Sequence, residues 1–411
     1  MKDIIFAFEV HQPFRMDRRF FWERKMFKQR RKEELFEYYF DNEVNRRVFE
    51  RASEKCYIPT NKILLDLIDL YKHEKKRVRL AFSLSGVFLE QCERFGEDVL
   101  DYFKQMAESG CVEFLEQTYY HSLSGLYSEK DEFKEQIFMH AKKIKELFGQ
   151  KPRVFRNTEL IYNNELAKFI EELGYVGILA EGADHVLGWR SPNFIYKPPM
   201  CKKIKILLKN YRLSDDIAFR FSNREWKEWP LTAEKFARWI DATNGNGHTV
   251  NLFMDYETIG EHQWAQTGIF RFMKNMPKEI LKHPDNNFKT PSEVVESYEA
   301  ISELDVHDTV SWADVERDLS AWLGNAMQQS AIRHLYELER RIKESRDERL
   351  LRDWRVLQTS DNFYYMCTKW FADGDVHKYF NPYKNPYEGF IAFMNVLNAV
   401  SYTHLTLPTK A

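Results

Sequence analysis

The chain has 411 residues and a formal net charge of −2 at pH 7, so positive and negative side chains nearly cancel. This balance excludes the overall basic field that attracts nucleic acid or an anionic membrane, and we expect an uncharged partner. The length suffices for one large α/β barrel with an appendage. With 10 Trp and 21 Tyr the chain is rich in rings on which sugars stack, although most such rings fill protein cores.

Cysteine usage and the N-terminus predict a cytoplasmic location. The N-terminal MKDIIFAFEVHQPF has a short apolar run that Glu9 interrupts, too short for a secretory signal, and no later stretch reaches membrane-spanning length. We expect the cysteines to be reduced and mostly buried, since they show neither a C-x-x-C pair nor the spacing of a disulfide framework. They stand at positions 56, 92, 111, 201 and 367.

Apolar strand candidates that end in polar residues recur along the chain. The first, Ile4 to Val10, runs directly into His11, Gln12 and Pro13. Folding alone gives no reason for polar residues at the ends of buried strands, so these positions are site candidates. The later examples are RLAFSLS near Ser83, CVEFLEQ near Glu113, RVFRNTE ending at Glu159, YVGILAEG near Glu181, and TVNLFMDYE ending at Asp255 and Glu257.

Helical periodicity separates these strand candidates, and the alternation predicts βα units and a parallel sheet. The predicted helices are Asn61 to Lys72, Phe95 to Met106, Glu129 to Phe148, and Asn163 to Leu173, the last of which Asn163 is expected to cap. After about Gly324 the strands stop. The remaining chain predicts long amphipathic helices at Ala326 to Ser345, Asp347 to Lys369 and Pro386 to Val400.

The predicted organisation is a catalytic barrel over residues 1–323 and a helical C-terminal subdomain over residues 324–400. Residues 401–411, SYTHLTLPTKA, break from the preceding helical pattern and resemble translated sequencing-adapter read-through. We expect them to be a non-native tail and the natural protein to continue beyond about Val400.

Two carboxylates at strand ends fit glycoside hydrolysis with retention. That chemistry needs one carboxylate to attack the anomeric carbon and one carboxyl group to shuttle a proton, about 5 to 5.5 Å apart. Glu159 follows one strand candidate, and Asp255 stands in LFMDYETIGEHQW, where acids, a histidine and a tryptophan crowd a strand exit. Such crowding is costly unless a ligand or proton is shared. Either carboxylate alone is equally compatible with a surface position.

Five segments, in order, resemble glycoside hydrolase family 57, the α-amylase and 4-α-glucanotransferase family. They are HQP at His11, VEFLEQTYYHSL around His121, FRNTEL at Glu159, MDYETIGEH at Asp255 and LQTSDNFYYM at Asp361. The resemblance implies an α/β fold, an incomplete (β/α)7 barrel, with Glu159 as nucleophile and Asp255 as general acid/base. Several family members have Glu before Pro where this chain has His121 and Ser, a form similar to the α-amylase-like branch.

The resemblance also implies that His11, Glu257 and Asp361 line the sugar-binding subsite, and the chemistry of other side chains adds candidates. His121 could donate to a hydroxyl while Tyr119 or Tyr120 stacks on the ring, and Trp312 or Trp322 could form a platform; each is equally compatible with a structural role. We further expect Asp255 to have a raised pKa, with Glu257 helping to raise it. The candidate substrate-binding residues are His11, Gln12, His121, Glu257, Asp361 and Trp264.

The predicted function is a retaining, α-amylase-like hydrolase of α-1,4-glucans that needs no cofactor or metal. A 4-α-glucanotransferase or branching enzyme would use the same residues, and a non-catalytic glucan-binding homologue is an alternative of another class. Metal catalysis is a further alternative, because related barrels of deacetylases and α-mannosidases use a histidine–aspartate metal site. His11, His121 and Asp255 stand at strand ends here, but no H-x-x-x-H pair supports such a site.

Overall fold

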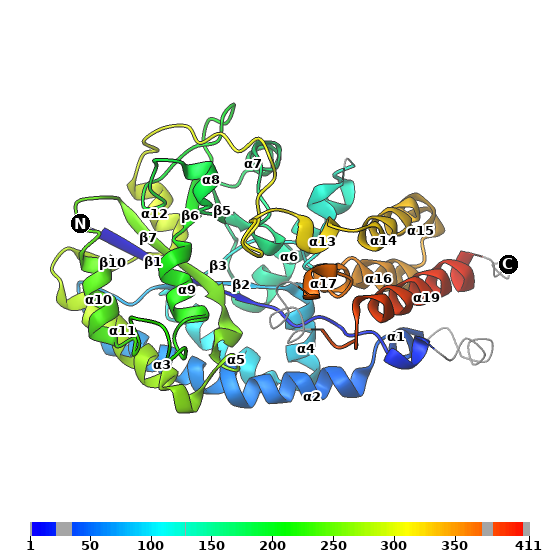
Figure 1. The fold of residues 1–411 in the computed structure, drawn as a ribbon, viewed down its shortest axis with the longest axis horizontal. Coiled ribbons are helices and arrows are strands. Elements are labelled where there is room, and N and C mark those ends of the chain that lie inside the picture. The colour runs from blue at the N-terminus through cyan, green and yellow to red at the C-terminus, as the bar shows by residue number, and fades with distance from the viewer. Residues whose placement is uncertain (1, 22–34, 128, 372–380, 406–411) are drawn as a thin grey trace.

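The structure is a computed structural model that describes residues 2–21, 35–127, 129–371 and 381–405. Parallel strands form its centre, helices surround them, and further helices lie toward the C-terminus (Figure 1). Around the centre the strands follow in the order β7 (Thr249–Asp255), β1 (Lys2–Val10), β2 (Leu80–Leu84), β3 (Val112–Phe114), β4 (Val154–Arg156), β5 (Gly177–Glu181) and β6 (Lys205–Lys209).

Two junctions in the ring of strands, between β3 and β4 and between β6 and β7, are made by isolated contacts. The bridge between Glu116 and Phe155 joins β3 to β4. Between β6 and β7, Asn210 N donates to Asn251 O (2.9 Å) and Asn251 Nδ2 donates to Leu208 O (2.8 Å). Isolated contacts, and not strand ladders, therefore join β3 to β4 and β6 to β7 in the described chain. The sheet is not continuous around the barrel, and the predicted incomplete (β/α)7 barrel is confirmed.

The strand predictions located β1 to β5 and β7 but missed the other four described strands. β6 and the short β10 (Asn286–Phe288), which pairs with the start of β1, were not predicted. β6 is a short apolar run with a lysine at each end, and this run was the signal from which the strand could have been predicted. Two further short strands, β8 (Ile259–Gly260) and β9 (Gln263–Trp264), pair with each other beyond β7.

Helices connect and cover the strands, and the four predicted barrel helices correspond to α3, α5, α6 and α7. Asn163 caps α7 as predicted, because its Oδ1 accepts from Leu166 N at 2.8 Å. The helices are α1 (Leu35–Tyr39), α2 (Asn42–Ala52), α3 (Ile58–Tyr71), α4 (Gly86–Phe95), α5 (Glu97–Glu108), α6 (Asp131–Phe148), α7 (Asn164–Glu172), α8 (Asp184–Leu187), α9 (Tyr211–Ala218), α10 (Ala233–Asp241), α11 (Ile269–Lys282) and α12 (Pro291–Ser297). Single turns are η1 (Arg18–Phe21), η4 (Ser53–Tyr57), η5 (Ser124–Leu126), η6 (Thr158–Leu160), η7 (Tyr256–Thr258) and η8 (Ala265–Thr267).

The C-terminal part is helical, as predicted, but the continuous helix from Asp347 to Lys369 is wrong. Thr359 adopts an extended conformation (φ −52°, ψ 131°) and breaks it. Its Oγ1 donates to Tyr120 O (3.0 Å), and Ser360 N donates to His121 O (2.9 Å), so the break docks on a barrel loop. The elements are α13 (Ser320–Leu323), α14 (Ala326–Glu337), α15 (Glu339–Ser345), α16 (Glu348–Leu357), α17 (Ser360–Tyr364), η9 (Thr368–Phe371) and α19 (Pro386–Leu405).

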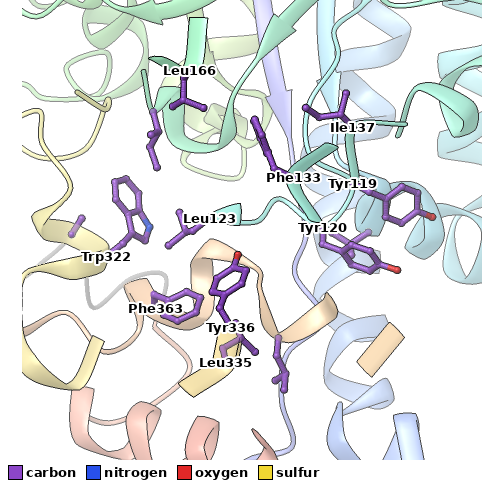
Figure 2. Packing of buried hydrophobic residues seen from close by; sticks show 14 of the residues in the cluster. Tyr119, Tyr120, Leu123, Phe133, Ile137, Leu166, Trp322, Leu335, Tyr336 and Phe363 are labelled. Carbon is purple, nitrogen blue, oxygen red and sulfur yellow. The ribbon is translucent and has the colours of Figure 1, made fainter. Parts of the chain in front are cut away.

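One hydrophobic core joins the barrel to these C-terminal helices. Figure 2 shows barrel side chains such as Phe133 and Leu123 facing Trp322, Tyr336 and Phe363 from the C-terminal part. Residues on both sides of the predicted boundary between positions 323 and 324 therefore belong to one hydrophobic core. α19 runs on to Leu405, and residues 406–411 of the predicted non-native tail lie outside the described residues.

A buried ion pair fastens α16 to α6. Arg355 donates from two nitrogens to the two carboxylate oxygens of Glu132, at 2.8 and 3.0 Å. Both side chains are buried, so Arg355→Met should lower the free energy of unfolding by about 3 kcal/mol, because it leaves a buried carboxylate with less compensation. Urea unfolding followed by tryptophan fluorescence measures this. Arg340→Met, which removes an exposed pair with Glu344, is the control that should leave the unfolding midpoint unchanged; equal effects would contradict the prediction.

All five cysteines are unpaired and buried, as predicted. None of the described helices combines the length and the apolar character that a membrane span requires.

Candidate active site

The predicted site residues gather where the barrel strands end. His11 follows β1, His121 lies in the loop after β3, Glu159 lies in η6 directly after β4, and Asp255 is the last residue of β7. The docked break after α16 brings Asp361, on α17, to the same place. Residues from five distant segments thus meet at the C-terminal end of the barrel, where barrel enzymes place their chemistry.

Both carboxylate oxygens of Glu159 are held. Oε1 accepts from Ser360 Oγ at 2.8 Å and lies 3.3 Å from His121 Nε2. Oε2 accepts from the indole Nε1 of Trp312 at 2.7 Å. The side chain is 17% exposed, so this fixed carboxylate still reaches solvent.

The backbone at this point adopts a conformation that few residues other than glycine tolerate. Glu159 has φ 57° and ψ 24°, the next residue, Leu160, has φ 51°, and His121 has φ 50°. Each left-handed residue costs about 1–2 kcal/mol, so the surrounding contacts must hold it. His121 and Glu159 thus combine a strained backbone with contacting polar side chains, which supports a functional role for these two residues.

A second group of side chains lies beside Glu159. The His11 and His121 rings stack with centroids 4.1 Å apart. His11 Nδ1 lies 2.7 Å from Ser85 Oγ, and its Nε2 lies 3.0 Å from Asp361 Oδ2. Burial opposes ionisation of Asp361, but His11 lowers the pKa of this carboxyl below its usual range. Asp361 therefore presents a charged oxygen that is suited to sugar hydroxyls.

Gln12 and Glu257 form a buried pair below Asp255. Gln12 Nε2 donates to Tyr57 Oη at 3.1 Å and to Glu257 Oε1 at 3.5 Å, while Tyr57 Oη donates to the same carboxyl oxygen. Burial and the charge of Asp255 raise the pKa of Glu257 to about 8, so it carries a proton at neutral pH.

The two predicted catalytic carboxyls have opposite protonation preferences. Burial works against ionisation of Glu159, but the hydrogen bond from His121 and the charge of Arg156 lower its pKa below the usual range. Burial, followed by the charge of Glu159, raises the pKa of Asp255 to about 6. The raised pKa of Asp255 was predicted; its main charged cause, however, is Glu159 rather than Glu257.

His121 is neutral near pH 7, because burial and the charge of His11 lower its pKa to about 4. It is 2% exposed and contacts Glu159, and its predicted contact with a sugar hydroxyl stays a prediction. Tyr119 and Tyr120 are buried as well, and Tyr119 donates to Glu90. Neither ring offers the open face that stacking on a sugar requires.

The predicted aromatic platforms separate into three environments. Trp322 is buried in the core that joins barrel and C-terminal helices (Figure 2). Trp264 is 60% exposed on the strand pair beyond β7, and its role in binding stays a prediction. Trp312 is the one of the three that contacts Glu159.

Three contacts of the site were not predicted. Glu9 and Arg156 form a buried ion pair beneath Glu159, Ser360 donates to Glu159, and Trp312 fixes its second oxygen. A charged residue inside an apolar strand must be paired when buried, so the interruption of the first strand by Glu9 was a usable signal.

The described part of the chain was predicted to need no metal ion for catalysis. No three His, Cys, Asp or Glu side chains are grouped there as a metal ion would need.

A barrel of parallel strands with polar side chains gathered at the strand ends is the architecture of a barrel enzyme. Residues 5–307 match the sequence pattern of glycosyl hydrolase family 57. A protein of Methanocaldococcus jannaschii described as "Putative alpha-amylase" is 45% identical over 409 residues, which are 97% of this chain and 84% of the relative. The chain belongs to glycosyl hydrolase family 57, as the five sequence segments predicted.

Solved structures share the fold at low sequence identity. A branching enzyme of this family from Thermococcus kodakaraensis superimposes with a TM-score of 0.64 and 15% identity over 97% of this chain and 88% of that one. The 4-alpha-glucanotransferase from Thermococcus litoralis gives a TM-score of 0.62 and 17% identity over 98% of this chain. This chain spans 60% of the length of that glucanotransferase.

Proposed function

We propose that the chain is a retaining α-amylase that cleaves α-1,4-glucans, with Glu159 as nucleophile and Asp255 as general acid/base. The observation that carries this proposal is the pair of opposite protonation preferences. Glu159 is held and has a lowered pKa, while burial and then the charge of Glu159 raise the pKa of Asp255 to about 6. Retaining hydrolysis requires this division between one attacking and one proton-donating carboxyl group.

The proposed reaction proceeds through two displacements at the anomeric carbon. The Glu159 carboxylate attacks the anomeric carbon, the glycosidic C–O bond breaks, and the Asp255 proton moves to the departing oxygen. The Asp255 carboxylate then accepts a proton from water, whose oxygen attacks the same carbon and releases Glu159. His11 and Asp361 lie beside the nucleophile and would bind hydroxyls of the reacting sugar.

The α-glucan substrate is supported by the family and by its relatives, whose descriptions name alpha-amylase, glucanotransferase and branching enzyme. A transferase would use an acceptor sugar in place of water in the second displacement, with the same residues. A cytoplasmic location remains part of the proposal.

Product analysis on maltoheptaose tests the function. We expect maltooligosaccharides shorter than the substrate and none longer, with unchanged activity in the presence of a chelator. Longer products would favour transfer, loss of activity with the chelator would favour the metal-dependent alternative, and glucan binding without turnover would favour the non-catalytic homologue.

The pH dependence follows from the two pKa shifts. A general acid works in its protonated form, so kcat/KM should fall as pH rises through about 6, the pKa of Asp255. The nucleophile works ionised, so kcat/KM should also fall at acidic pH, where Glu159 gains a proton. Rates measured between about pH 3 and 9 test this expectation. With α-maltosyl fluoride, whose leaving group needs no proton, the alkaline limb should flatten; a rate that rises through pH 6 would contradict the assignment of Asp255.

A further inference from the structure

A buried ion pair crosses the barrel directly beneath the proposed nucleophile. Glu9, on the central strand β1, is 1% exposed, and Arg156, on β4, is fully buried. The guanidinium donates from Nη1 and Nη2 to the two carboxyl oxygens of Glu9, and this bidentate geometry fixes both side chains. We call these two residues the Glu9–Arg156 pair.

The Glu9–Arg156 pair reaches each oxygen of Glu159 through a different side chain. On one side, His121 Nδ1 lies 3.1 Å from Glu9 Oε1, and His121 Nε2 lies 3.3 Å from Glu159 Oε1. On the other side, the Arg156 guanidinium lies 5.1 Å from the centre of the Trp312 ring, and Trp312 Nε1 donates to Glu159 Oε2. Two of the three groups that hold the nucleophile, His121 and Trp312, therefore contact the pair; Ser360 is the third, and Gln117 Oε1 also lies 3.1 Å from His121 Nδ1.

Charge also links the pair to the rest of the site. The groups that face Glu9 are Arg156 from β4, His121 from the loop after β3, Glu159 from η6, and, from β7 and η7, Asp255 and Glu257. Glu9 is directly opposite Asp255 in the register of β1 and β7. Burial, together with the three other carboxyl groups, raises the pKa of Glu9 well above its usual range, although the charge of Arg156 opposes this shift.

We infer that Glu9 is a positioning residue for the reaction. With Arg156 it holds His121 and Trp312 so that the Glu159 carboxylate, on its left-handed backbone, stays aimed at the anomeric carbon. Attack requires an aligned oxygen within about 3–3.5 Å of that carbon, and a freely rotating carboxylate would seldom be aligned. This role rests on the proposed function of Glu159 as nucleophile.

Glu9→Gln tests the role, since glutamine keeps the size of the side chain and replaces one of the two oxygens that accept from Arg156 with an amino group. We expect kcat on maltoheptaose, per active site, to fall about 10²-fold while KM stays within about 2-fold, because alignment of the nucleophile matters in the transition state more than in substrate binding. Glu9→Asp, which restores the carboxyl group, should recover part of kcat.

Glu116→Gln is the matched control. Glu116 is a fully buried barrel carboxylate that pairs with His140 and accepts from Tyr175 Oη at 2.9 Å. Its loss should cost stability in a similar way, yet it should leave kcat per active site unchanged. Equal losses of kcat in the two variants, or no loss in Glu9→Gln, would overturn the inference.

A crystal structure of Glu9→Gln gives a readout that does not depend on turnover. We expect Glu159 to lose its contact with His121 or with Trp312. If both contacts persist, the inference fails. If the contacts change but the parent enzyme does not cleave maltoheptaose, the proposed function fails and the structural coupling of Glu9 to Glu159 stands.

Discussion

Glu159→Gly should lower the rate of maltoheptaose cleavage by about 10⁵-fold, and added azide should partly restore turnover of α-maltosyl fluoride. The variant removes the attacking carboxylate and leaves space on the face opposite the departing group. Azide that enters this space displaces the leaving group once, so the product should be a β-glycosyl azide. NMR gives the anomeric configuration of the glycosyl azide, and a β configuration shows that the variant lacks the nucleophile.

An α-glycosyl azide from this variant would contradict the assignment, because it requires two displacements and hence an intact nucleophile. Ser360→Ala is the matched control: it removes one hydrogen bond to Glu159 but keeps the carboxylate. It should retain measurable cleavage of maltoheptaose and give no β-glycosyl azide.

Asp255→Ala should show a loss that depends on the leaving group. We expect kcat/KM for maltoheptaose to fall about 10⁴-fold, since the departing sugar oxygen then leaves without a proton. For α-maltosyl fluoride, kcat/KM should fall by less than about 10-fold, because fluoride needs no protonation. Azide should raise kcat of this variant and yield an α-glycosyl azide through two displacements.

Glu257→Gln is the control for the second prediction. Glu257 lies two residues from Asp255 and is bonded to Tyr57 and Gln12, and it holds a proton at neutral pH. Its replacement should change the rates for both substrates in similar proportion. If Asp255→Ala loses activity equally on both substrates, Asp255 is not the proton donor.

Much of the fold was predictable because strand and helix periodicities are local. The apolar runs that end at His11, Glu159 and Asp255 gave three of the central strands and the end of the barrel that carries the site. β6 was missed, although it completes the ring, because its flanking lysines resemble the charged helices around it. The break at Thr359 depends on contacts with the His121 loop, which helical periodicity alone does not contain.

The site was predictable in its residues more than in its contacts. The order of five segments indicated the carboxyls and histidines, but it did not indicate the contact between His121 and Glu159. Trp312 was one of several equal candidates until the structure placed its indole against Glu159. Glu9 and Arg156 are far apart in sequence, and their pairing arises only when β1 and β4 face each other across the barrel.

Trapping the covalent intermediate tests the central claim most directly. 5-Fluoro-α-D-glucosyl fluoride slows both displacements but keeps a good leaving group, so a retaining enzyme accumulates the glycosyl-enzyme. After proteolysis, mass spectrometry should find the sugar on the peptide that contains Glu159, and on no peptide of Glu159→Gly. A sugar bound to Asp255, or an enzyme that turns over maltoheptaose while no adduct forms on Glu159, would contradict the account.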